Sequence, residues 1–342
     1  MRVDLFDYDL PPDLIAQHPF EPRDSARLLH VTADGLADRH VRDLPDLLRP
    51  GDLLVLNDTK VLPTRFFARR GEVPVEITLV ERAGPAAWFA YAKPGKRLRP
   101  GDAVALAEDL AATVLGKDAE GRVRLGFDMA EADLLAAISR RGSMPLPPYI
   151  RRKADDAADR ADYQTIFARA EGAVAAPTAA LHFTPALMAA LAARGIGHAF
   201  VTLHVGAGTF LPVKVEDTAD HRMHAESCEL PPATAERIAA TRTAGGRIVA
   251  VGTTSLRTLE SFADGAGGVR PGTTSTKLFI TPGWRFSTAD LLLTNFHLPR
   301  STLLMLVAAF AGLERIMAAY SHAIRERYRF YSYGDASLLE CQ

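Results

Sequence analysis

The stretch TPALMAALAARGIGHAFVTLHV, residues 184–205, carries the signals that decide the fold class of this chain. Thr184 is a residue type that caps helix N-termini, and Pro185 follows at the first helical position, where its missing N–H costs nothing. Gly195 stands where helices commonly end, because glycine adopts the left-handed conformation of that position without strain. The apolar run 198–205 follows at once and predicts a buried strand. The stretch therefore predicts a helix followed directly by a strand.

The same alternation continues toward the C-terminus. Strands are predicted at short apolar runs, and helices where apolar residues recur every three or four positions. The predicted strands are 198–205, 225–230, 247–253, 276–280 and 291–296, and the predicted helices are 233–244, 255–262, 301–310 and 313–328. Helices that alternate with strands favour a three-layer α/β domain, in which helices cover both faces of one sheet.

A different pattern occupies residues 65–128. The apolar runs there are short, and glycine or proline separates each run from the next, as in a small antiparallel barrel. A predicted helix over 131–141 and the proline-rich segment Met144–Tyr149 follow, and consecutive prolines cannot continue a helix. We therefore expect a separate β module that ends at this segment, with a buried strand over 52–57 before it.

Length and composition narrow the class of protein. The 342 residues exceed the roughly 250–300 that one core fills, so two domains are expected. The 40 Lys+Arg and 41 Asp+Glu residues give a formal charge of −1, and 48% of residues are hydrophobic, which excludes a disordered chain and a polybasic nucleic-acid coat. Cys228 and Cys341 are too few for a disulfide framework or a closed zinc site, so a cytoplasmic protein is expected.

No membrane segment is expected either. The longest apolar run, 303–311, is far shorter than the roughly 20 residues that a membrane span needs. The segment Met1–Asp4 opens no signal-peptide core.

Polar residues follow four of the predicted strands. They lie in the segments 57–60, 204–210, 252–255 and 295–302. Ligands of open α/β sheets bind beyond the carboxyl ends of the strands, so we expect these four segments to converge on one pocket.

The segment Gly252–Ser255 opens a predicted helix. Unpaired N–H groups and the helix dipole at such a start favour a carboxylate or phosphate, and Arg257 would add a guanidinium one turn later. An ordinary helix cap at Thr254 explains the same residues equally well. Residues 204–210 do not form a dinucleotide-binding loop, because the third glycine of that motif is missing and Pro212 blocks an immediate helix.

Five of the histidines in the α/β part are candidates for a chemical role: His182, His204, His221, His224 and His297. The spacing of two of them next to Glu226 resembles a set of metal ligands, so a zinc or iron site stays open as an alternative. Neither of the two lies on a predicted helix face, however, and a single histidine is more often structural. Histidine transfers protons near neutral pH, and we favour that role for one or two of the five.

Basic residues gather near the β module and its exits, although the whole chain is close to neutral. The clusters are Arg65, Arg69 and Arg70, then Lys93, Lys96, Arg97 and Arg99, and then Arg151, Arg152 and Lys153. Such clusters bind nucleic-acid phosphates in many proteins. A solvated surface balanced by nearby acids explains them equally well.

Motifs over nearly the whole chain match those of a known family. They are DLIAQHP (13–19), EPRD (21–24), NDTKV (57–61), MPLPPYIR (144–151), YQT (163–165), GAVAAPT (172–178), LHF (181–183), FVTLHVGAGTF (200–210), HRMH (221–224), VGTTS (251–255), LTNFHLPRSTL (293–303) and YRFYSYGD (328–335). With these motifs the chain resembles the S-adenosylmethionine:tRNA ribosyltransferase-isomerases, enzymes of queuosine biosynthesis.

The resemblance implies a fold and a reaction. The α/β catalytic domain would be discontinuous, at 1–64 and 150–342, with an inserted β-barrel domain at 65–149. The ribosyl moiety of S-adenosylmethionine would be transferred to a 7-aminomethyl-7-deazaguanine base in a tRNA anticodon loop and isomerised to an epoxycyclopentanediol. The products would be epoxyqueuosine-tRNA, adenine and methionine. S-adenosylmethionine would be consumed as a substrate, with no true cofactor and no metal, and we expect a monomer.

Two stretches depart from the family pattern. Gly71–Glu76 replaces a Gly-Gly pair before a Val-Glu strand, and Thr178–Phe183 has alanine where the family often has glycine. Neither departure changes a titratable group.

The strand-end argument and the resemblance together give a set of candidate residues. A base must remove a ribose 5′ proton beside the sulfonium, and an acid must assist the departure of adenine. The candidate proton carriers are His204 and His297, with His224 and Asp58 in reserve, and Glu226 or Asp335 as the acceptor of a proton from the incoming amine. The candidates for binding S-adenosylmethionine are Gly252, Thr253, Thr254 and Arg257 at the methionine carboxylate, Phe296 and Tyr333 at adenine or the sulfonium, and Asn295.

The candidates for binding tRNA phosphates are Lys96, Arg97, Arg151 and Arg152. Two other classes of function remain as alternatives, a non-catalytic tRNA-binding protein and a histidine-ligated metal hydrolase.

Overall fold

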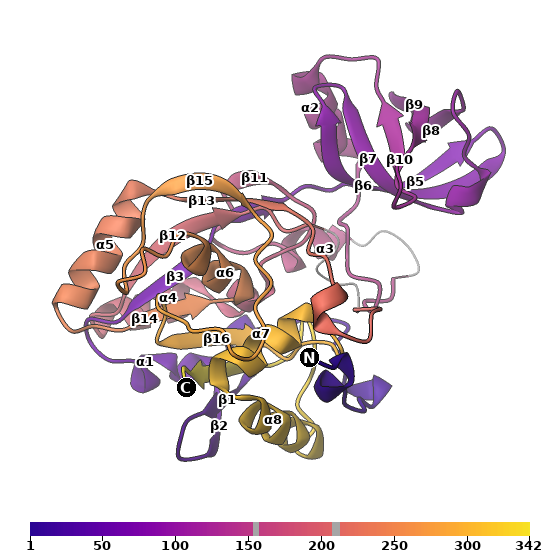
Figure 1. The fold of residues 1–342 in the computed structure, drawn as a ribbon. Coiled ribbons are helices and arrows are strands. Elements are labelled where there is room, and N and C mark those ends of the chain that lie inside the picture. The colour runs from indigo at the N-terminus through magenta and orange to yellow at the C-terminus, as the bar shows by residue number, and fades with distance from the viewer. Residues whose placement is uncertain (153–156, 207–212) are drawn as a thin grey trace.

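The computed structural model describes residues 1–152, 157–206 and 213–342. A domain built on a nine-stranded sheet and a closed β-barrel stand side by side (Figure 1). The strand order in the sheet is β15-β13-β12-β3-β14-β16-β17-β1-β2. In chain order these strands are β1 (Arg27–Val31), β2 (Leu36–His40), β3 (Leu53–Asn57), β12 (Gly197–Leu203), β13 (Glu226–Leu230), β14 (Ile248–Val251), β15 (Gly272–Thr276), β16 (Leu291–Asn295) and β17 (Ala336–Glu340).

The centre of the sheet is parallel. Strands β12, β3, β14 and β16 run in one direction, so their carboxyl ends meet at one edge. Strand β17 is antiparallel to β16 and parallel to β1, and β13, β15 and β2 are antiparallel to their neighbours. Parallel neighbours need long crossover connections, which the helices supply.

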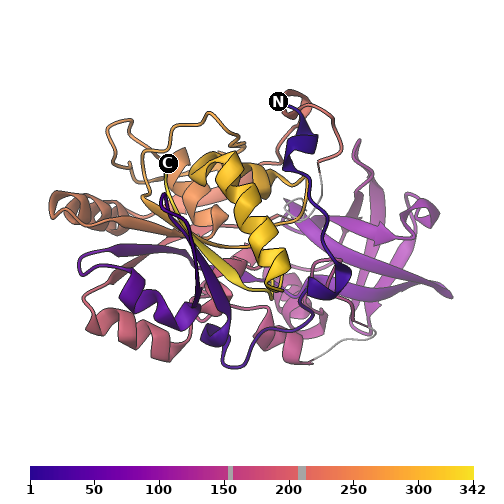
Figure 2. The same cartoon turned by 90° about the horizontal axis from the view of Figure 1, so that it is seen from below.

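Helices cover both faces of the sheet. They are α1 (Leu44–Leu47), α4 (Pro185–Ala193), α5 (Pro232–Thr243), α6 (Thr253–Ser261), α7 (Thr302–Ala311) and α8 (Leu313–Arg325). Leu53 and Val55 of β3 belong to the core beneath α5–α8, whereas Leu54 and Leu56 belong to the core beneath α1 and α4. Helices α7 and α8 lie across one face of the sheet (Figure 2). The predicted three-layer α/β domain is therefore confirmed.

The stretch that opens the sequence analysis folds as predicted. The Thr184 side chain accepts a hydrogen bond of 3.1 Å from the N–H of Leu187 and caps α4. Leu187 and Leu191 are buried on the sheet, and each contributes roughly 1.5–3 kcal/mol by leaving water. Strand β12 follows, beginning at Gly197.

Some elements differ from the prediction. Strand β15 lies at Gly272–Thr276 instead of 276–280, and four of its five residues are exposed, so no apolar pattern marks this edge strand. Strands β1, β2 and β17 were not predicted. Strands β1 and β17 join the sheet by pairing with each other, and β17 also pairs with β16, although β1 and β17 are distant in sequence; β2 joins only as the hairpin partner of β1.

The inserted β module is a closed barrel with strand order β10-β7-β6-β5-β8-β9, as the glycine and proline pattern predicts. Its strands are β5 (Arg65–Arg70), β6 (Val73–Gly84), β7 (Ala87–Lys93), β8 (Ala103–Ala107), β9 (Leu110–Lys117) and β10 (Val123–Gly126). Helix α2 (Glu131–Arg141) packs Leu134 and Ile138 into the barrel core, which also contains Phe66 and Trp88.

The chain enters and leaves the barrel at one place. Arg65 and Ser143 exchange two backbone hydrogen bonds of 3.1 and 2.8 Å. Only glycine fits at position 142, next to Ser143, because a Cβ there would lie 1.6 Å from the carbonyl oxygen of Pro63. The domain boundaries 64/65 and 149/150 stay a prediction.

Smaller elements connect the two parts. Strand β4 (Thr59–Val61) pairs in parallel with β11 (Ala170–Ala173), and α3 (Ala157–Asp162) precedes β11. In the described residues no single helix is long and apolar enough to span a membrane; α7 and α8 reach that length and composition only as a pair bent by 114°.

Candidate active site

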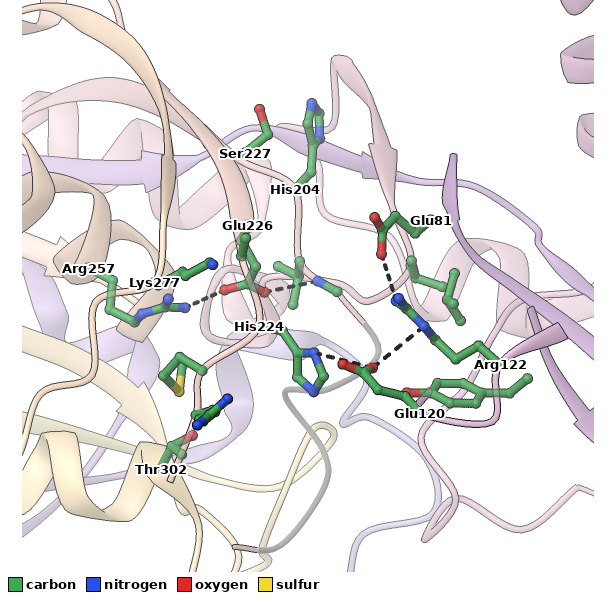
Figure 3. Close-up of a pocket in the computed structure, with 18 of the residues that line it drawn as sticks. Glu81, Glu120, Arg122, His204, His224, Glu226, Ser227, Arg257, Lys277 and Thr302 are labelled. Carbon is green, nitrogen blue, oxygen red and sulfur yellow. Dashed lines mark hydrogen bonds and ion pairs between the residues drawn. The ribbon is translucent and has the colours of Figure 1, made fainter. Parts of the chain in front are cut away.

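A cleft of about 1060 Å³ lies between the barrel and the sheet domain. The barrel wall is formed by β6, β7 and the turn before β10, and the sheet wall by the ends of β12 and β13, by α6 and by the start of α7. Figure 3 shows the two walls facing each other, with Glu81, Glu120 and Arg122 opposite Glu226 and Arg257.

His204 lines the cleft directly after the end of β12. Its Nδ1 lies 2.8 Å from the hydroxyl oxygen of the buried Thr59. The ring also lies against the backbone of Gly172, where a Cβ would come within 2.9 Å of ring atoms. Thr59 and Gly172 therefore hold the imidazole in one orientation.

The electrostatic environment keeps His204 neutral at physiological pH. Partial burial lowers the pKa of His204, and it outweighs the opposing effect of the Asp58 carboxylate. A neutral imidazole that has one nitrogen fixed by a hydroxyl can transfer a proton through the other nitrogen.

A buried ion pair also lines the cleft. Arg257 of α6 and Glu226 at the start of β13 are joined through Nη1 and Oε2, and their side chains are 5% and 6% exposed. Glu226 Oε1 accepts the N–H of Gly206 at 2.9 Å, and Arg257 Nε donates to the carbonyl of Leu278 at 3.2 Å. The second terminal nitrogen of Arg257, Nη2, is buried and has no hydrogen-bond partner among the residues that the structure describes.

An unsatisfied guanidinium nitrogen at a pocket wall is a binding feature. A buried donor without a partner costs about 1–3 kcal/mol, and a charged donor costs more. A ligand oxygen that accepted its hydrogen bond would recover this free energy. Arg257 thus has one terminal nitrogen bonded to Glu226, while the other, Nη2, is buried without an acceptor among the described residues.

A network of charges connects the two walls. Arg122 of the barrel lies 2.6 Å from Glu81 and 3.5 Å from Glu120. Glu120 in turn lies 3.9 Å from Nδ1 of His224, which belongs to the sheet domain (Figure 3). His224 and Glu120 are both about half exposed, so this contact contributes little stability.

The structure does not bring His297 to the cleft. The side chain is buried, and its Nε2 lies 2.9 Å from the hydroxyl of Thr294. The backbone of His297 accepts a hydrogen bond from Tyr8 and donates one to Tyr320. Burial lowers the pKa of His297 to about 3, so the ring remains neutral in the folded protein.

Buried neutral histidines make stability depend on pH. The pKa of His297 falls to about 3 and that of His182 to about 4, both through burial, against about 6.5 when unfolded. The unfolded chain therefore binds more protons below pH 6.5, and the free energy of unfolding is expected to fall as pH drops from 6.5 toward 4. The slope for each histidine is at most about 1.4 kcal/mol per pH unit.

Urea unfolding at pH 7, 6, 5 and 4 measures this slope. His297→Gln is expected to flatten it, while the matched change at the exposed His18, His18→Gln, is expected to leave it unchanged. Equal slopes for the wild type and His297→Gln would contradict the expectation.

The two other predicted carboxylates are held by the structure away from the cleft. Asp58 accepts from Thr202 at 2.6 Å and pairs with Arg169 at 2.9 Å. Asp335 accepts the backbone N–H groups of Arg27 and Arg329, each at 2.7 Å, and burial raises its pKa.

The predicted anion site at the start of α6 lies in the interior. Gly252, at φ +87°, begins the helix, and Thr253 and Thr254 are buried outside the cleft lining. Asn57 donates to Thr254 at 3.2 Å and to the carbonyl of Leu203 at 2.9 Å, so it ties the start of α6 to the end of β12. Of this group only Arg257 reaches the cleft.

Three further predicted binding residues also lie outside the cleft lining. Asn295 bonds to His182 and to the backbone of Tyr331, and Phe296 is packed among core aromatic rings. Tyr333 is buried beside a cavity of about 10 Å³, roughly the space of one water molecule.

The predicted tRNA-binding residues fall into two groups. Lys96, Arg97 and Arg151 are exposed and lie outside the cleft lining. Arg152 is enclosed: its guanidinium binds Asp159 at 2.9–3.1 Å and the carbonyl of Gln17 at 2.9 Å. Arg152 therefore acts as a structural clamp and presents no free charge to a phosphate.

The spacing of His221 and His224 in the sequence is compatible with a metal site. Both line the cleft, and His221 packs edge-on against Phe279 at 5.0 Å between ring centroids. Across the described ranges, no three His, Cys, Asp or Glu side chains form a group that could hold a metal ion.

Sequence reasoning missed several residues that line the cleft or support His204. Thr59 and Gly172 stand inside the quoted motifs, but nothing in the sequence showed that both support His204. Tyr91 and Arg122 lie in barrel strands and turns, whose facing toward the sheet depends on how the two domains pack.

Comparison with known proteins places these features in context. A family model described as "Queuosine biosynthesis protein" matches residues 3–339. A curated S-adenosylmethionine:tRNA ribosyltransferase-isomerase of Rhodospirillum rubrum is 61% identical over 339 residues, covering 99% of this chain and 98% of the relative. One from Methylobacterium sp. (strain 4-46) is 59% identical over 356 residues, with the same two shares covered.

A solved structure is also similar. The crystal structure of S-adenosylmethionine tRNA ribosyltransferase from Thermotoga maritima is 39% identical, with a TM-score of 0.55. The match covers 98% of this chain and 99% of that chain.

Proposed function

The chain belongs to the queuosine-biosynthesis family of S-adenosylmethionine:tRNA ribosyltransferase-isomerases, and on that basis we propose how its cleft carries out the reaction. Its substrates are S-adenosylmethionine and tRNA. The tRNA enters by its anticodon loop and presents a 7-aminomethyl-7-deazaguanine base. The products are epoxyqueuosine-tRNA, adenine and methionine, and S-adenosylmethionine is consumed rather than regenerated.

One observation carries the proposal. A neutral, oriented histidine and a buried guanidinium with an unsatisfied nitrogen line the same cleft, at the carboxyl edge of the sheet. A volume of about 1060 Å³ is at the upper end of typical ligand pockets, which fits a donor nucleoside together with a nucleotide of the acceptor.

His204 is the base of this mechanism. When its Nδ1 carries the hydrogen, the Thr59 hydroxyl accepts that hydrogen and can donate its own toward the carbonyl of Ala170, 3.4 Å away. Nε2 then keeps its lone pair and removes a 5′ proton of the ribose, which the positive sulfonium acidifies.

The remaining steps need a proton donor and an anchor. Adenine leaves C1′ with the bonding electron pair and takes a proton, for which His224 is the second carrier in the cleft. The aminomethyl nitrogen loses a proton as it bonds to the ribosyl carbon, and Glu226 is the nearby carboxylate. Arg257 holds the methionine carboxylate through Nη2, and the sulfur keeps its electron pair as methionine departs.

His297, Asp58 and Asp335 have no proton-transfer role in this mechanism, because their partners hold them away from the cleft. We propose that the protein acts as a monomer. The cytoplasm holds both substrates and is the proposed compartment.

The test compares two tRNA substrates. Incubation with S-adenosylmethionine and tRNA bearing the aminomethyl base is expected to release adenine and methionine in equal amounts, while the same tRNA with guanine releases neither. Binding of the modified tRNA without adenine release would instead favour a non-catalytic binding protein. Activity that a chelator removes would favour a metal hydrolase.

A further inference from the structure

Three basic side chains stand on the sheet side of the cleft without acidic partners. Lys214, Arg222 and Lys277 all line the cleft, and all three are exposed. Within the described part of the chain none of them forms an ion pair, in contrast to most arginines around them. Asp220 is an exposed carboxylate on the same wall, so the wall keeps a positive surplus.

The barrel side of the cleft has no surplus of positive charge. Arg82 is paired with Glu131, and Arg122 contacts Glu81, Asp118 and Glu120. These carboxylates neutralise the arginines before any ligand arrives. Among the described residues that line the cleft, the basic side chains without an acidic partner therefore lie on the sheet side.

The barrel side offers an aromatic surface instead. Tyr91 of β7 lines the cleft, and 37% of its surface is exposed, which is unusual for a large ring in this structure. An exposed aromatic ring in a nucleic-acid cleft stacks on an unpaired base, because every base has a flat π face.

We propose that the tRNA loop lies in the cleft with a fixed orientation. Its phosphodiester backbone follows Lys214, Arg222 and Lys277 on the sheet side, and one unstacked loop base packs on Tyr91 of the barrel. The inference rests on the proposed function and deepens it by naming the tRNA-binding surface. In this arrangement the tRNA phosphates contact these three residues and not the earlier candidates Lys96, Arg97, Arg151 and Arg152.

Salt dependence of tRNA binding tests the backbone contacts. Each phosphate neutralised on single-stranded RNA contributes about 0.7 to the slope of log K against log salt. The triple variant Lys214→Ala/Arg222→Ala/Lys277→Ala is therefore expected to lower the magnitude of that slope by about 2 and to weaken binding at low salt. Fluorescence anisotropy with the unmodified anticodon stem-loop RNA gives both values.

A charge-matched control separates local contacts from net charge. Arg39→Ala/Arg42→Ala/Arg49→Ala removes the same charge from exposed residues outside the cleft lining, and it is expected to keep the wild-type slope. Donor binding should stay unchanged in both triple variants. If both variants lose the same slope, or neither does, the proposed backbone path is wrong.

The stacking contact has its own pair of variants. Tyr91→Ala is expected to weaken binding of the stem-loop by about 5- to 150-fold, whereas Tyr91→Phe retains the ring and the affinity. Equal affinity of Tyr91→Ala and the wild type, with unchanged thermal unfolding, would overturn the assignment.

These outcomes are separable from the proposed function. Should the wild type bind the stem-loop with the expected slope but release no adenine from S-adenosylmethionine, the reaction assignment fails and the binding surface stands. Should the wild type release adenine while the Lys214/Arg222/Lys277 variant binds RNA normally, only the surface is wrong.

Discussion

Replacing His204 with alanine is expected to lower the rate of adenine release by about 10²- to 10⁴-fold, the usual contribution of a positioned general base. The neutral ring faces the cleft, and Thr59 and Gly172 hold its orientation. Binding of S-adenosylmethionine should change little, because the base acts on the transition state and not on the donor carboxylate. Single-turnover assays and calorimetric binding measure the two quantities.

His198→Ala is the matched control. His198 lies in β12, the strand that ends just before His204; it lies outside the cleft lining and packs against Phe200. It is expected to keep turnover near that of the wild type. Full turnover by folded His204→Ala protein would remove His204 from the mechanism.

Two changes at Thr59 test the tautomer. Thr59→Ser keeps the hydroxyl partner of Nδ1 and is expected to retain the pH profile of turnover. Thr59→Val removes that partner, so the rate should fall and the acidic limb of the profile should move. Identical profiles for both variants would show that the 2.8 Å contact does not orient the base.

Replacing Arg257 with alanine is expected to have two large effects. The buried carboxylate of Glu226 loses its ion pair with Arg257, which lowers the free energy of unfolding by about 3–5 kcal/mol. The donor carboxylate loses a charged hydrogen bond, which weakens binding of S-adenosylmethionine by roughly 10- to 150-fold. Denaturant unfolding and calorimetric titration measure the two effects separately.

The pair Arg152 and Asp159 supplies the matched control. It is a second buried ion pair, with side chains 9% and 5% exposed, and it does not line the cleft. Arg152→Ala is expected to lose similar stability while the folded fraction keeps its affinity for S-adenosylmethionine. Equal donor affinity of Arg257→Ala and the wild type would contradict the role of Nη2.

The parts of the fold that the sequence predicted are those with local signals. Thr184, Pro185 and Gly195 define α4 through caps and turns alone, and the dense glycine and proline pattern defines the barrel. Strands β1 and β17 carry no such signal. Each is ordinary in isolation and becomes part of the sheet only because its partner, distant in sequence, lies beside it.

The sequence predicted that the site lies beyond the ends of the strands, but it did not predict which side chains there reach the cleft. Polar residues do follow β12 and β16, but His204 lines the cleft, whereas the side chain of His297 is buried against Thr294. Which way a side chain turns beyond a strand depends on the packing of neighbouring elements. The same holds for Arg152, whose enclosure by Asp159 could not be read from a basic cluster.

The backbone hydrogen bonds between Arg65 and Ser143 hold the two ends of the barrel together. The inserted barrel therefore adds little to the entropy that the sheet domain loses when it folds. Strand β3 pairs with β12, so Leu53 must find Gly197 across the whole inserted segment. Once the barrel has formed, its two ends are adjacent, and the chain between β3 and β12 behaves as a much shorter loop. Because each halving of a flexible loop saves only about 0.6 kcal/mol, such an insertion adds a second wall for the cleft at little entropic cost to the sheet.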